Sequence, residues 1–263
     1  FGTGREVSFP DGELIKRFTI AEGVLDSDGL VSLPKLKTHA LTRMTGAVKN
    51  QFGCIPGMLK GEFHARMPDV ERFSQMLVDL NRLLAPRLVV MDAVIAMEGN
   101  GPRGGDPRQV GVLLISDDPV AVDAVGCRIM ALDPGLVGTC VWGERFGLGS
   151  MSEIEVLGDD VPVIDDFVVH RAHGSTTGKL GSSLGKRLLA PRPYIVPERC
   201  TRCGTCVAVC PVAPKAVDFP AGERTRVPEH DYERCIRCYC CQEMCPERAI
   251  EVTTPLLGRL IRR

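Results

Sequence analysis

The sequence predicts an α/β domain with a mostly parallel sheet, followed by a small α+β domain made of two similar halves. Apolar strand-like and helix-like segments alternate through residues 1–169, as they do in α/β domains. Residues 170–193 are rich in Gly, Ser and basic residues, a composition typical of linkers. Residues 194–252 hold two matched cysteine runs, and a mildly amphipathic tail follows at 253–263.

The expected elements of the first domain follow from their residue patterns. A strand over 28–36 ends at Pro34, which has no N–H to give to a sheet. The segment 86–97 is apolar on both sides, which predicts a strand in a sheet covered on both faces. The Asp-Asp-Pro sequence at 117–119 predicts the start of a helix. In chain order, we expect strands over 28–36, 86–97, 110–116 and 153–158, and helices over 69–84 and 117–132.

The two cysteine runs share one spacing. Each reads Cys-x2-Cys-x2-Cys-x3-Cys-Pro, the first over 200–211 and the second over 235–246. Two intervening residues let a tight loop wrap three thiolates around one iron–sulfur cubane. We expect the fourth cysteine to open a helix and face the other cluster, since the Pro after it suits a first helical turn. This assigns one 4Fe-4S cluster to Cys200, Cys203, Cys206 and Cys245, and the other to Cys235, Cys238, Cys241 and Cys210.

Disulfides and zinc explain this pattern less well. Disulfides need an oxidising compartment and have no use for regular triplets of cysteine. Zinc sites favour separate Cys-x2-4-Cys pairs rather than runs of four that end in Cys-Pro. Cys240 lies between two ligands of the second run, and we interpret it as a packed free thiol. The same interpretation applies to the three cysteines without ligand spacing, Cys54, Cys127 and Cys140.

Over residues 194–252 the chain resembles the bacterial two-cluster ferredoxins. The sequence KAVDF follows the first cysteine run and RAIEV follows the second. Each half therefore reads as a strand, a cluster loop, a short helix and a strand. The resemblance implies two 4Fe-4S clusters as cofactors and electron transfer as their role.

The formal charge is divided between the two parts of the chain. Residues 1–169 carry 16 Lys+Arg and 24 Asp+Glu, a charge of −8, whereas residues 170–263 carry 16 and 9, a charge of +7. Thiolates would bring about −8 and two oxidised cubane cores about +4 to the second part. Basic residues there therefore offset cluster charge, and no nucleic acid is expected as a partner. Three Tyr and one Trp also offer few stacking residues for a single strand.

Polar residues after the first strand are suited to binding an anion. Lys35, Lys37 and His39 alternate, so an extended backbone places them on one face. Lys49 and Asn50 follow at a Gly-bounded segment. Ligands of α/β sheets bind at the ends of strands, which favours a small anionic substrate here. A solvated basic loop is the alternative.

The segment 97–107 contains a literal G-x-G-x-x-G over 99–104. That fingerprint must open a helix. Here a proline interrupts it and a strand is expected next, so we expect no dinucleotide site. We expect a tight functional loop that presents Glu98, Asn100 and Arg103, and a plain Gly-rich connector is the alternative.

Two acidic residues lie inside apolar segments. Asp92 is in an expected strand and Asp123 in an expected helix. A carboxylate in such surroundings needs a partner, and Lys35, Lys37 or Lys49 is available. A structural ion pair and a catalytic pair both remain open.

The chain also resembles the domain of unknown function 362 family in its ferredoxin-fused form. The resemblance runs over residues 13–158 and is carried by LPKLKTHALTRMTGAVKNQFG and MDAVIAMEGNGPRGGDPRQVGVLLISDDPVAVDAVGCRIMALDP, together with the cysteine runs. It also suggests that an N-terminal α/β portion of the usual domain is absent. It implies function for the residues in these signature segments: Lys35, Lys37, His39, Lys49, Asn50, Glu98, Asn100 and Asp123.

Together these patterns predict a cytoplasmic iron–sulfur protein that passes electrons to or from an anionic substrate in the α/β domain. No apolar run reaches the roughly 18 residues of a membrane helix, and no signal peptide precedes Phe1. The protein is then an iron–sulfur oxidoreductase. One alternative is a non-catalytic carrier that docks a redox partner protein, and another is a ligand-binding protein with structural clusters. In the leading hypothesis, His39, Lys49 and Asp123 are catalytic, and Lys35, Lys37, Asn50, Glu98 and Asn100 bind the substrate.

Overall fold

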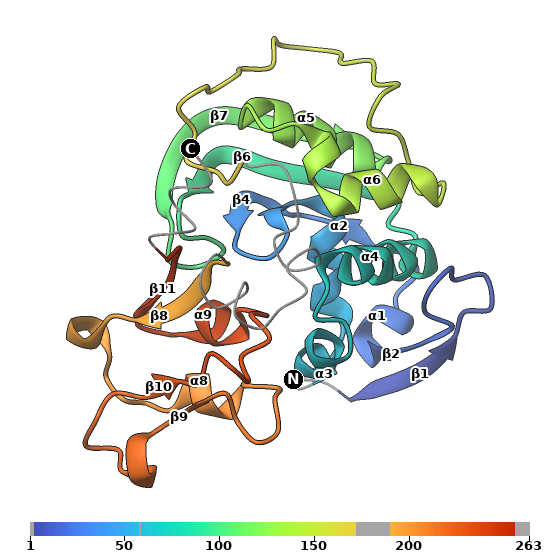
Figure 1. Cartoon of the computed structure of the whole chain (residues 1–263). Coiled ribbons are helices and arrows are strands. Elements are labelled where there is room, and N and C mark those ends of the chain that lie inside the picture. The colour runs from blue at the N-terminus through green and yellow to red at the C-terminus, as the bar shows by residue number, and fades with distance from the viewer. Residues whose placement is uncertain (1–2, 58, 172–189, 256–263) are drawn as a thin grey trace.

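The computed structural model describes residues 3–57, 59–171 and 190–255 (Figure 1). The N-terminal part is an α/β domain built around one five-stranded sheet, with a separate two-stranded hairpin beside it. Its strands are β1 (Gly4–Ser8), β2 (Arg17–Ala21), β3 (Val31–Ser32), β4 (Lys35–His39), β5 (Arg43–Thr45), β6 (Leu88–Glu98) and β7 (Asp106–Ser116). Its helices are α1 (Glu22–Leu25), α2 (Ala47–Asn50), α3 (Leu59–Arg66), α4 (Val70–Leu84), α5 (Pro119–Ile129) and α6 (Gly138–Arg145).

The sheet is mixed and is centred on β6. Strands β3 and β4 both pair in parallel with β6, whereas β7 pairs with it antiparallel and β5 pairs antiparallel with β4. The predicted α/β class is therefore confirmed. The predicted strand 28–36 is divided into β3 and β4, because Pro34 cannot donate to the ladder between them.

In the part of the chain that the structure describes, helices cover one face of this sheet. Val89, Met91 and Ala93 of β6 point into the core that α4, α5 and α6 close, while Val94 is 42% exposed on the other face. The expectation that the segment 86–97 has no solvent face is therefore wrong. Aliphatic side chains such as Val94 also lie on its outward face, and hydrophobicity alone cannot distinguish an exposed aliphatic side chain from a buried one.

The two long helices begin where the sequence predicts. Asp69 caps α4 by accepting a hydrogen bond from the N–H of Glu71, and Asp118 caps α5 by accepting from Val120 and Ala121. The predicted strand at 153–158 is absent, and these residues have no regular secondary structure. Its alternating pattern is that of a strand, but the segment does not pair with any described strand.

The C-terminal part, which we call the cysteine-rich unit, consists of two similar halves. Both halves show the expected order of strand, loop, short helix and strand, and their strands pair as β8 with β11 and β9 with β10, all antiparallel. The first half is β8 (Arg192–Ile195), α8 (Thr205–Ala208) and β9 (Val217–Asp218); the second is β10 (Glu229–His230), α9 (Cys240–Met244) and β11 (Ile250–Thr253).

The fourth cysteine of each run does not open a helix, contrary to prediction. Cys210 follows α8, and Cys245 is the C-terminal cap of α9 with φ −66° and ψ 115°. The prolines at 211 and 246 therefore end a helix instead of starting one, since a residue before proline avoids the helical region. The third cysteine of each run is the helical one.

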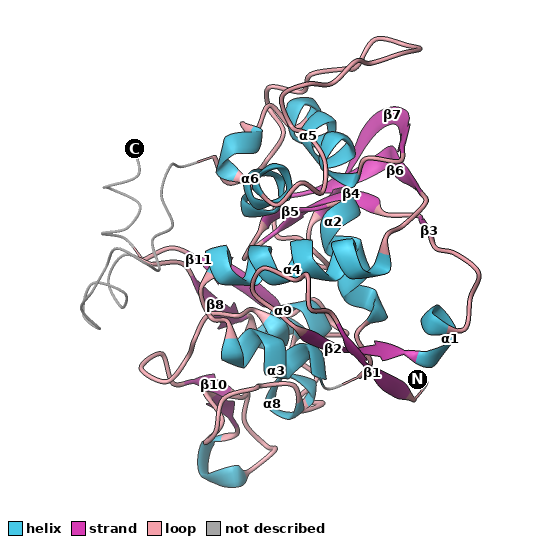
Figure 2. Ribbon diagram, turned by 90° about the vertical axis from the view of Figure 1, so that its right-hand side faces the viewer, coloured by secondary structure: helices cyan, strands magenta, loops and turns pink. Residues whose placement is uncertain are grey.

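The cysteine-rich unit packs directly below the sheet of the α/β domain (Figures 1 and 2). Strand β4 and the loop after β6 meet α9 and β11 through hydrogen bonds described below. On the side of α3, a Cβ atom placed on Gly61 would lie 3.8 Å from the Cβ atom of Pro211. The predicted linker and tail lie mostly outside the described residues.

A buried carboxylate fixes the N-terminal hairpin to α4. Asp79 is fully buried and accepts hydrogen bonds from the backbone N–H groups of Glu13, Leu14 and Ile15 at 2.7–2.8 Å. We expect Asp79→Asn to lower the free energy of unfolding by about 2–3 kcal/mol, because hydrogen bonds to a charged acceptor are lost in a buried place. Thermal denaturation of the purified chain measures this. Asp69→Asn, at an exposed helix cap, is the control, and an equally small loss in both variants would contradict the prediction.

Candidate functional site

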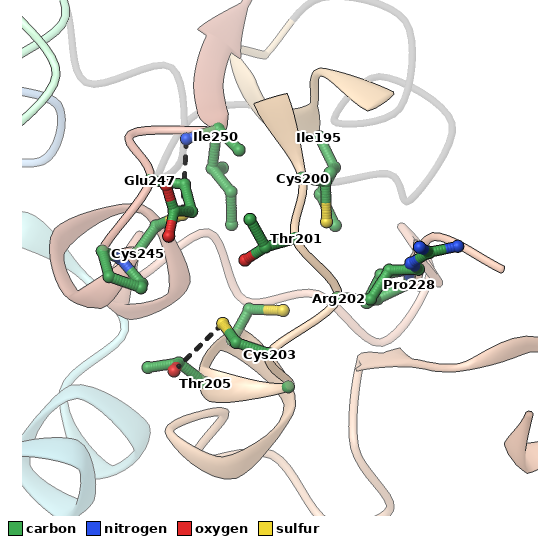
Figure 3. Close-up of a pocket in the computed structure, with 14 residues that line it drawn as sticks. Ile195, Cys200, Thr201, Arg202, Cys203, Thr205, Pro228, Cys245, Glu247 and Ile250 are labelled. Carbon is green, nitrogen blue, oxygen red and sulfur yellow. Dashed lines mark hydrogen bonds between the residues drawn. The ribbon is translucent and has the colours of Figure 1, made fainter. Parts of the chain in front are cut away.

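Four cysteines of the first predicted set line one small cavity (Figure 3). Cys200, Cys203, Cys206 and Cys245 surround it together with Ile195, and Cys203 is the exposed member. Three of these cysteines come from the first cysteine run, and the fourth comes from the end of α9 in the other half. The structure thus brings the four cysteines of this predicted set together, and their role as cluster ligands stays a prediction.

The second set converges in the same way. The pKa of the Cys235 thiol is raised to about 11, mainly by burial, and the neighbouring Cys238 and Cys210 sulfurs add to the rise. Burial also raises the pKa of Cys241, again with Cys238, Cys235 and Cys210 as near neighbours. Four thiols gathered in one place are a site for a positively charged inorganic core, which stabilises the thiolates.

The surroundings of the sulfurs fit 4Fe-4S clusters. The backbone N–H groups of Ala216 and Ala249 donate to the sulfurs of Cys210 and Cys245 at 3.4 and 3.3 Å. Among the described residues, no group of three or more His, Cys, Asp or Glu side chains is close enough to hold a single metal ion. In a cubane each thiolate binds a different iron, so four cysteines need not meet at one point.

A cluster of polar side chains lies where the two units meet, and we call it the interdomain cluster. Its centre is Glu243 of α9, which hydrogen-bonds to Nε2 of His39 and lies 3.6 Å from Nζ of Lys49. Lys37 is close enough for its pKa to be affected by both Lys49 and Glu243. His64, from α3, completes this cluster and is buried. Three segments of the α/β domain, β4, α2 and α3, thus surround one carboxylate of the cysteine-rich unit.

The protonation states in the interdomain cluster follow from burial and charge. Burial and then Lys49 lower the pKa of His39 to about 4, so its imidazole is neutral at pH 7. Burial acts to raise the pKa of Glu243, but Lys49 and His39 hold it well below its usual range. Burial, followed by Lys49, lowers the pKa of Lys37 from its ordinary value. The cluster therefore holds one carboxylate and two lysines.

The tautomer of His39 is set by the backbone. The N–H groups of Leu41 and Thr42 donate to its Nδ1 at 3.0 and 3.3 Å. An imidazole nitrogen that accepts carries no proton, so the proton of neutral His39 is on Nε2. That proton points at Glu243.

Asp123 of α5 hydrogen-bonds to the start of α2, the helix that carries Lys49. It is buried, and its carboxylate accepts hydrogen bonds from the N–H groups of Ala47 at 2.5 Å and Val48 at 3.1 Å, at the start of α2. Gly46 makes the approach possible, because a Cβ atom there would lie 2.1 Å from Oδ1 of Asp123. Asp123 thus pairs with backbone rather than with a lysine, and it orients the short helix that carries Lys49.

The other predicted residues lie outside the interdomain cluster. Lys35 pairs with Asp92 at 2.6 Å, and both are nearly half exposed, because the register of β4 on β6 shifts between Lys35 and Lys37. Asn50 donates to the hydroxyl of Ser32 at 3.1 Å. Glu98 accepts from the N–H of Val168 at 3.0 Å and lies 3.5 Å from Arg108.

Asn100 joins the two units. Its side chain donates to the carbonyl of Ile250 at 3.1 Å and accepts from the N–H of Val252 at 3.2 Å. The amide of Gln242 donates to both oxygens of Asn100, at 2.9 and 3.0 Å, and to the carbonyl of Gly101. The loop can pass this close to β4 because residue 101 is glycine. A Cβ atom on Gly101 would lie only 2.1 Å from the carbonyl oxygen of Thr38.

Glu243, Gln242 and His64 are not among the residues predicted from the sequence. For Glu243 and Gln242, the internal repeat contains a pattern that indicates an unusual environment. Val207 and Ala208 of the first half correspond to Gln242 and Glu243 of the second, counted from the third cysteine of each run. A polar pair that replaces an apolar pair in a repeat indicates a different environment. His64 has no comparable signal.

We expect Asn100→Ala to loosen the contact between the two units. The variant loses hydrogen bonds to Ile250, Val252 and Gln242, each worth about 0.5–1.5 kcal/mol. Hydrogen exchange should become faster at the backbone of β11 and of the 97–107 loop. Arg103→Ala, in the same loop with an exposed side chain, is the control and should leave exchange in β11 unchanged. Unchanged exchange in Asn100→Ala would contradict the prediction.

Asp123 should make stability depend on pH. Burial raises its pKa to about 7 in the folded chain, above the ordinary value of 3.8. The folded state then holds a proton that the unfolded state has lost between about pH 4 and pH 7, so this group favours folding less as the pH rises through that window. We expect wild type to lose stability relative to Asp123→Asn between pH 5 and pH 8 in denaturant titrations. A constant difference between the two proteins would argue against a raised pKa.

Comparisons with known proteins agree with this division of the chain. Residues 1–128 match the family described as Domain of unknown function (DUF362), and residues 192–246 match the family described as 4Fe-4S dicluster domain. Over 139 residues the chain is 42% identical to the thylakoid-associated protein sll1697 of Synechocystis sp. (strain ATCC 27184 / PCC 6803 / Kazusa), a match that covers 52% of this chain and 43% of that protein. The match thus spans less than half the length of this relative. The chain joins a DUF362 domain to a 4Fe-4S dicluster domain that binds two 4Fe-4S clusters through its cysteines.

Proposed function

We propose that the protein transfers electrons to or from a small anionic molecule bound at the interdomain cluster. One observation carries the proposal: Glu243, which contacts His39 and Lys49, lies on α9 between the cluster ligands Cys241 and Cys245. A molecule at this place would be separated from the cluster ligands by little more than one short helix. When bound, the clusters supply or accept single electrons.

The charge of the interdomain cluster favours an anion. Lys37 and Lys49 bring two positive charges, Glu243 brings one negative charge, and His39 is neutral at pH 7. Burial opposes the charged form of Lys37 and Lys49 opposes it further, while Glu243 offsets the two effects only in part. No ion pair of Lys37 is present within the described residues. A carboxylate or phosphate group beside Lys37 would offset both, since a partly buried charge gains most from a partner.

The remaining side chains have separate tasks in this proposal. Lys37 and Lys49 hold the anion, and Asp123 keeps α2 and therefore Lys49 in place. His39 donates its Nε2–H to Glu243 and so holds that carboxylate beside Lys49. Lys35 lies apart in its exposed pair with Asp92 and has no part in the site.

Two other functions lead to different outcomes. A non-catalytic carrier would dock a partner oxidoreductase through the α/β domain, and its electron exchange would not depend on Lys37 or Lys49. A ligand-binding protein with structural clusters would bind the anion without any change in cluster oxidation state. No helix among the described residues is long and apolar enough to cross a membrane. Location in the cytoplasm stays a prediction.

A chemical screen tests the proposal directly. The anaerobic protein is reduced with dithionite, excess reductant is removed, and a panel of small carboxylates and phosphate esters that each carry a reducible group, such as a carbonyl or a conjugated double bond, is added one compound at a time. We expect at least one compound to reoxidise the clusters, seen as recovery of absorbance and loss of the EPR signals. Failure of every compound, with reoxidation by an added redox protein intact, would instead favour the carrier.

Lysine variants then locate the site. Lys37→Ala and Lys49→Ala should each raise the concentration of the active compound needed for half-maximal reoxidation by about 10–100-fold, the effect of losing one charge-assisted contact. Lys35→Ala is a closely matched control, because Lys35 lies on the same strand as Lys37 but in an exposed ion pair. Equal effects in Lys35→Ala and Lys37→Ala would place the anion elsewhere.

A further inference from the structure

The two halves of the cysteine-rich unit have the same backbone around their cysteines. Arg202 and Arg237 have φ of 59° and 58°, and Gly204 and Tyr239, the N-terminal caps of α8 and α9, are both left-handed. Each of these pairs is separated by the same 35 residues as the cysteine runs. Positions in one half can therefore be compared directly with positions in the other.

At one such pair of equivalent positions, an aliphatic side chain in the first half is replaced by an imidazole in the second. Ile195 ends β8 and His230 ends β10, each five residues before the first cysteine of its run. Ile195 is a buried apolar wall of the cavity formed by the first cysteine set (Figure 3). His230 instead places Nε2 3.5 Å from the sulfur of Cys241, within hydrogen-bond reach for sulfur. Its ring is stacked on Tyr232, with centroids 5.8 Å apart and planes 9° apart.

We propose that His230 donates an N–H hydrogen bond to the sulfur of Cys241 and thereby raises the reduction potential of the cluster that Cys241 binds. Reduction adds negative charge that is spread over the core and the thiolates. A donor aimed at a ligand sulfur stabilises that charge, so the reduced state is favoured. A cluster-bound thiolate has no proton to donate, so Nε2 carries the N–H in this contact whether the imidazole is neutral or protonated, and the proposal does not depend on titration of His230.

The first set has no equivalent of this donor. Its Cys203 has the hydroxyl of Thr205 at 3.3 Å (Figure 3), and Cys240 is the residue at the corresponding position beside Cys238. A thiol is a weaker donor than a hydroxyl. This second difference acts in the opposite direction to the histidine, so comparing the two clusters of the wild type cannot isolate the effect of His230. A substitution at position 195 or position 230 alone can isolate it.

The position of the tuned cluster gives the inference a consequence, which rests on the proposed function. Glu243 influences the pKa of Cys238, a member of the second set, and α3 approaches Pro211 next to Cys210 of the same set. The second set is thus the one beside the α/β domain, whereas the first set has the exposed Cys203. A raised potential at the second set would hold electrons next to the interdomain cluster.

Potentiometric titration with EPR detection tests the proposal in the absence of any substrate. We expect His230→Ile to lower the reduction potential of one cluster and to leave that of the other unchanged, with about eight irons per chain retained. His230→Gln, which keeps an N–H donor, should lie closer to wild type. Resonance Raman should show the Fe–S(Cys) stretching frequencies rise in His230→Ile, because loss of the hydrogen bond strengthens one iron–sulfur bond. Unchanged potentials and frequencies in His230→Ile would overturn the proposal.

The reciprocal variant makes the test independent of whether His230→Ile assembles its cluster. Ile195→His should raise the potential of the other cluster, since it introduces a donor at the equivalent position. If His230→Ile loses iron, this variant decides: a raised potential supports the proposal, and an unchanged one overturns it. Because no substrate is present in either titration, the result is separate from the outcome of the reoxidation screen.

Discussion

The carboxylate of Glu243 is the group on which the arrangement of the two units depends. A carboxylate at a packed interface needs partners, because an unpaired one would be strongly destabilising. Its partners, His39 and Lys49, come from positions about 200 residues earlier in the chain. Glu243 lies on α9 between the predicted cluster ligands Cys241 and Cys245, so the position of its carboxylate depends on how these cysteines are held. Cluster binding and the geometry of the polar residues are therefore connected through one short helix.

The loop after β6 makes that orientation specific. Asn100 and Gln242 exchange hydrogen bonds with backbone on both sides of the interface, so neither unit can slide without leaving amides unpaired. Ion pairs alone tolerate small shifts, whereas amide bonds with defined directions do not. The Gly-rich sequence at 99–104 serves this contact: it lets the loop pass close to β4, and its literal resemblance to a dinucleotide fingerprint has no structural counterpart. The next element is the strand β7, as the sequence predicts.

Local chemistry was predictable and long-range pairing was not. The caps of α4 and α5 and the break at Pro34 follow from residue type and position. The alternation of Lys35, Lys37 and His39 predicted one shared face, but an irregular register on β6 gives Lys35 a different partner from Lys37. Asp123 was expected to need a cation and found two backbone N–H groups instead. Periodicity describes one segment at a time, and these partners lie on other segments.

The internal repeat contains information that neither half shows alone. A module of two equivalent halves has two equivalent faces, and a domain packed on one face makes the halves unequal. The positions that diverge should then mark the packed face. Gln242 and Glu243, at the α/β domain, replace Val207 and Ala208, and Ala208 is exposed because nothing in the described chain covers it. His230 replaces Ile195 at a different kind of position, beside the sulfur of Cys241 within the cysteine-rich unit. In a duplicated cofactor module, therefore, differences between equivalent positions locate the partner domain and the asymmetry between the cofactors, whereas the shared cysteines identify only the cofactor itself.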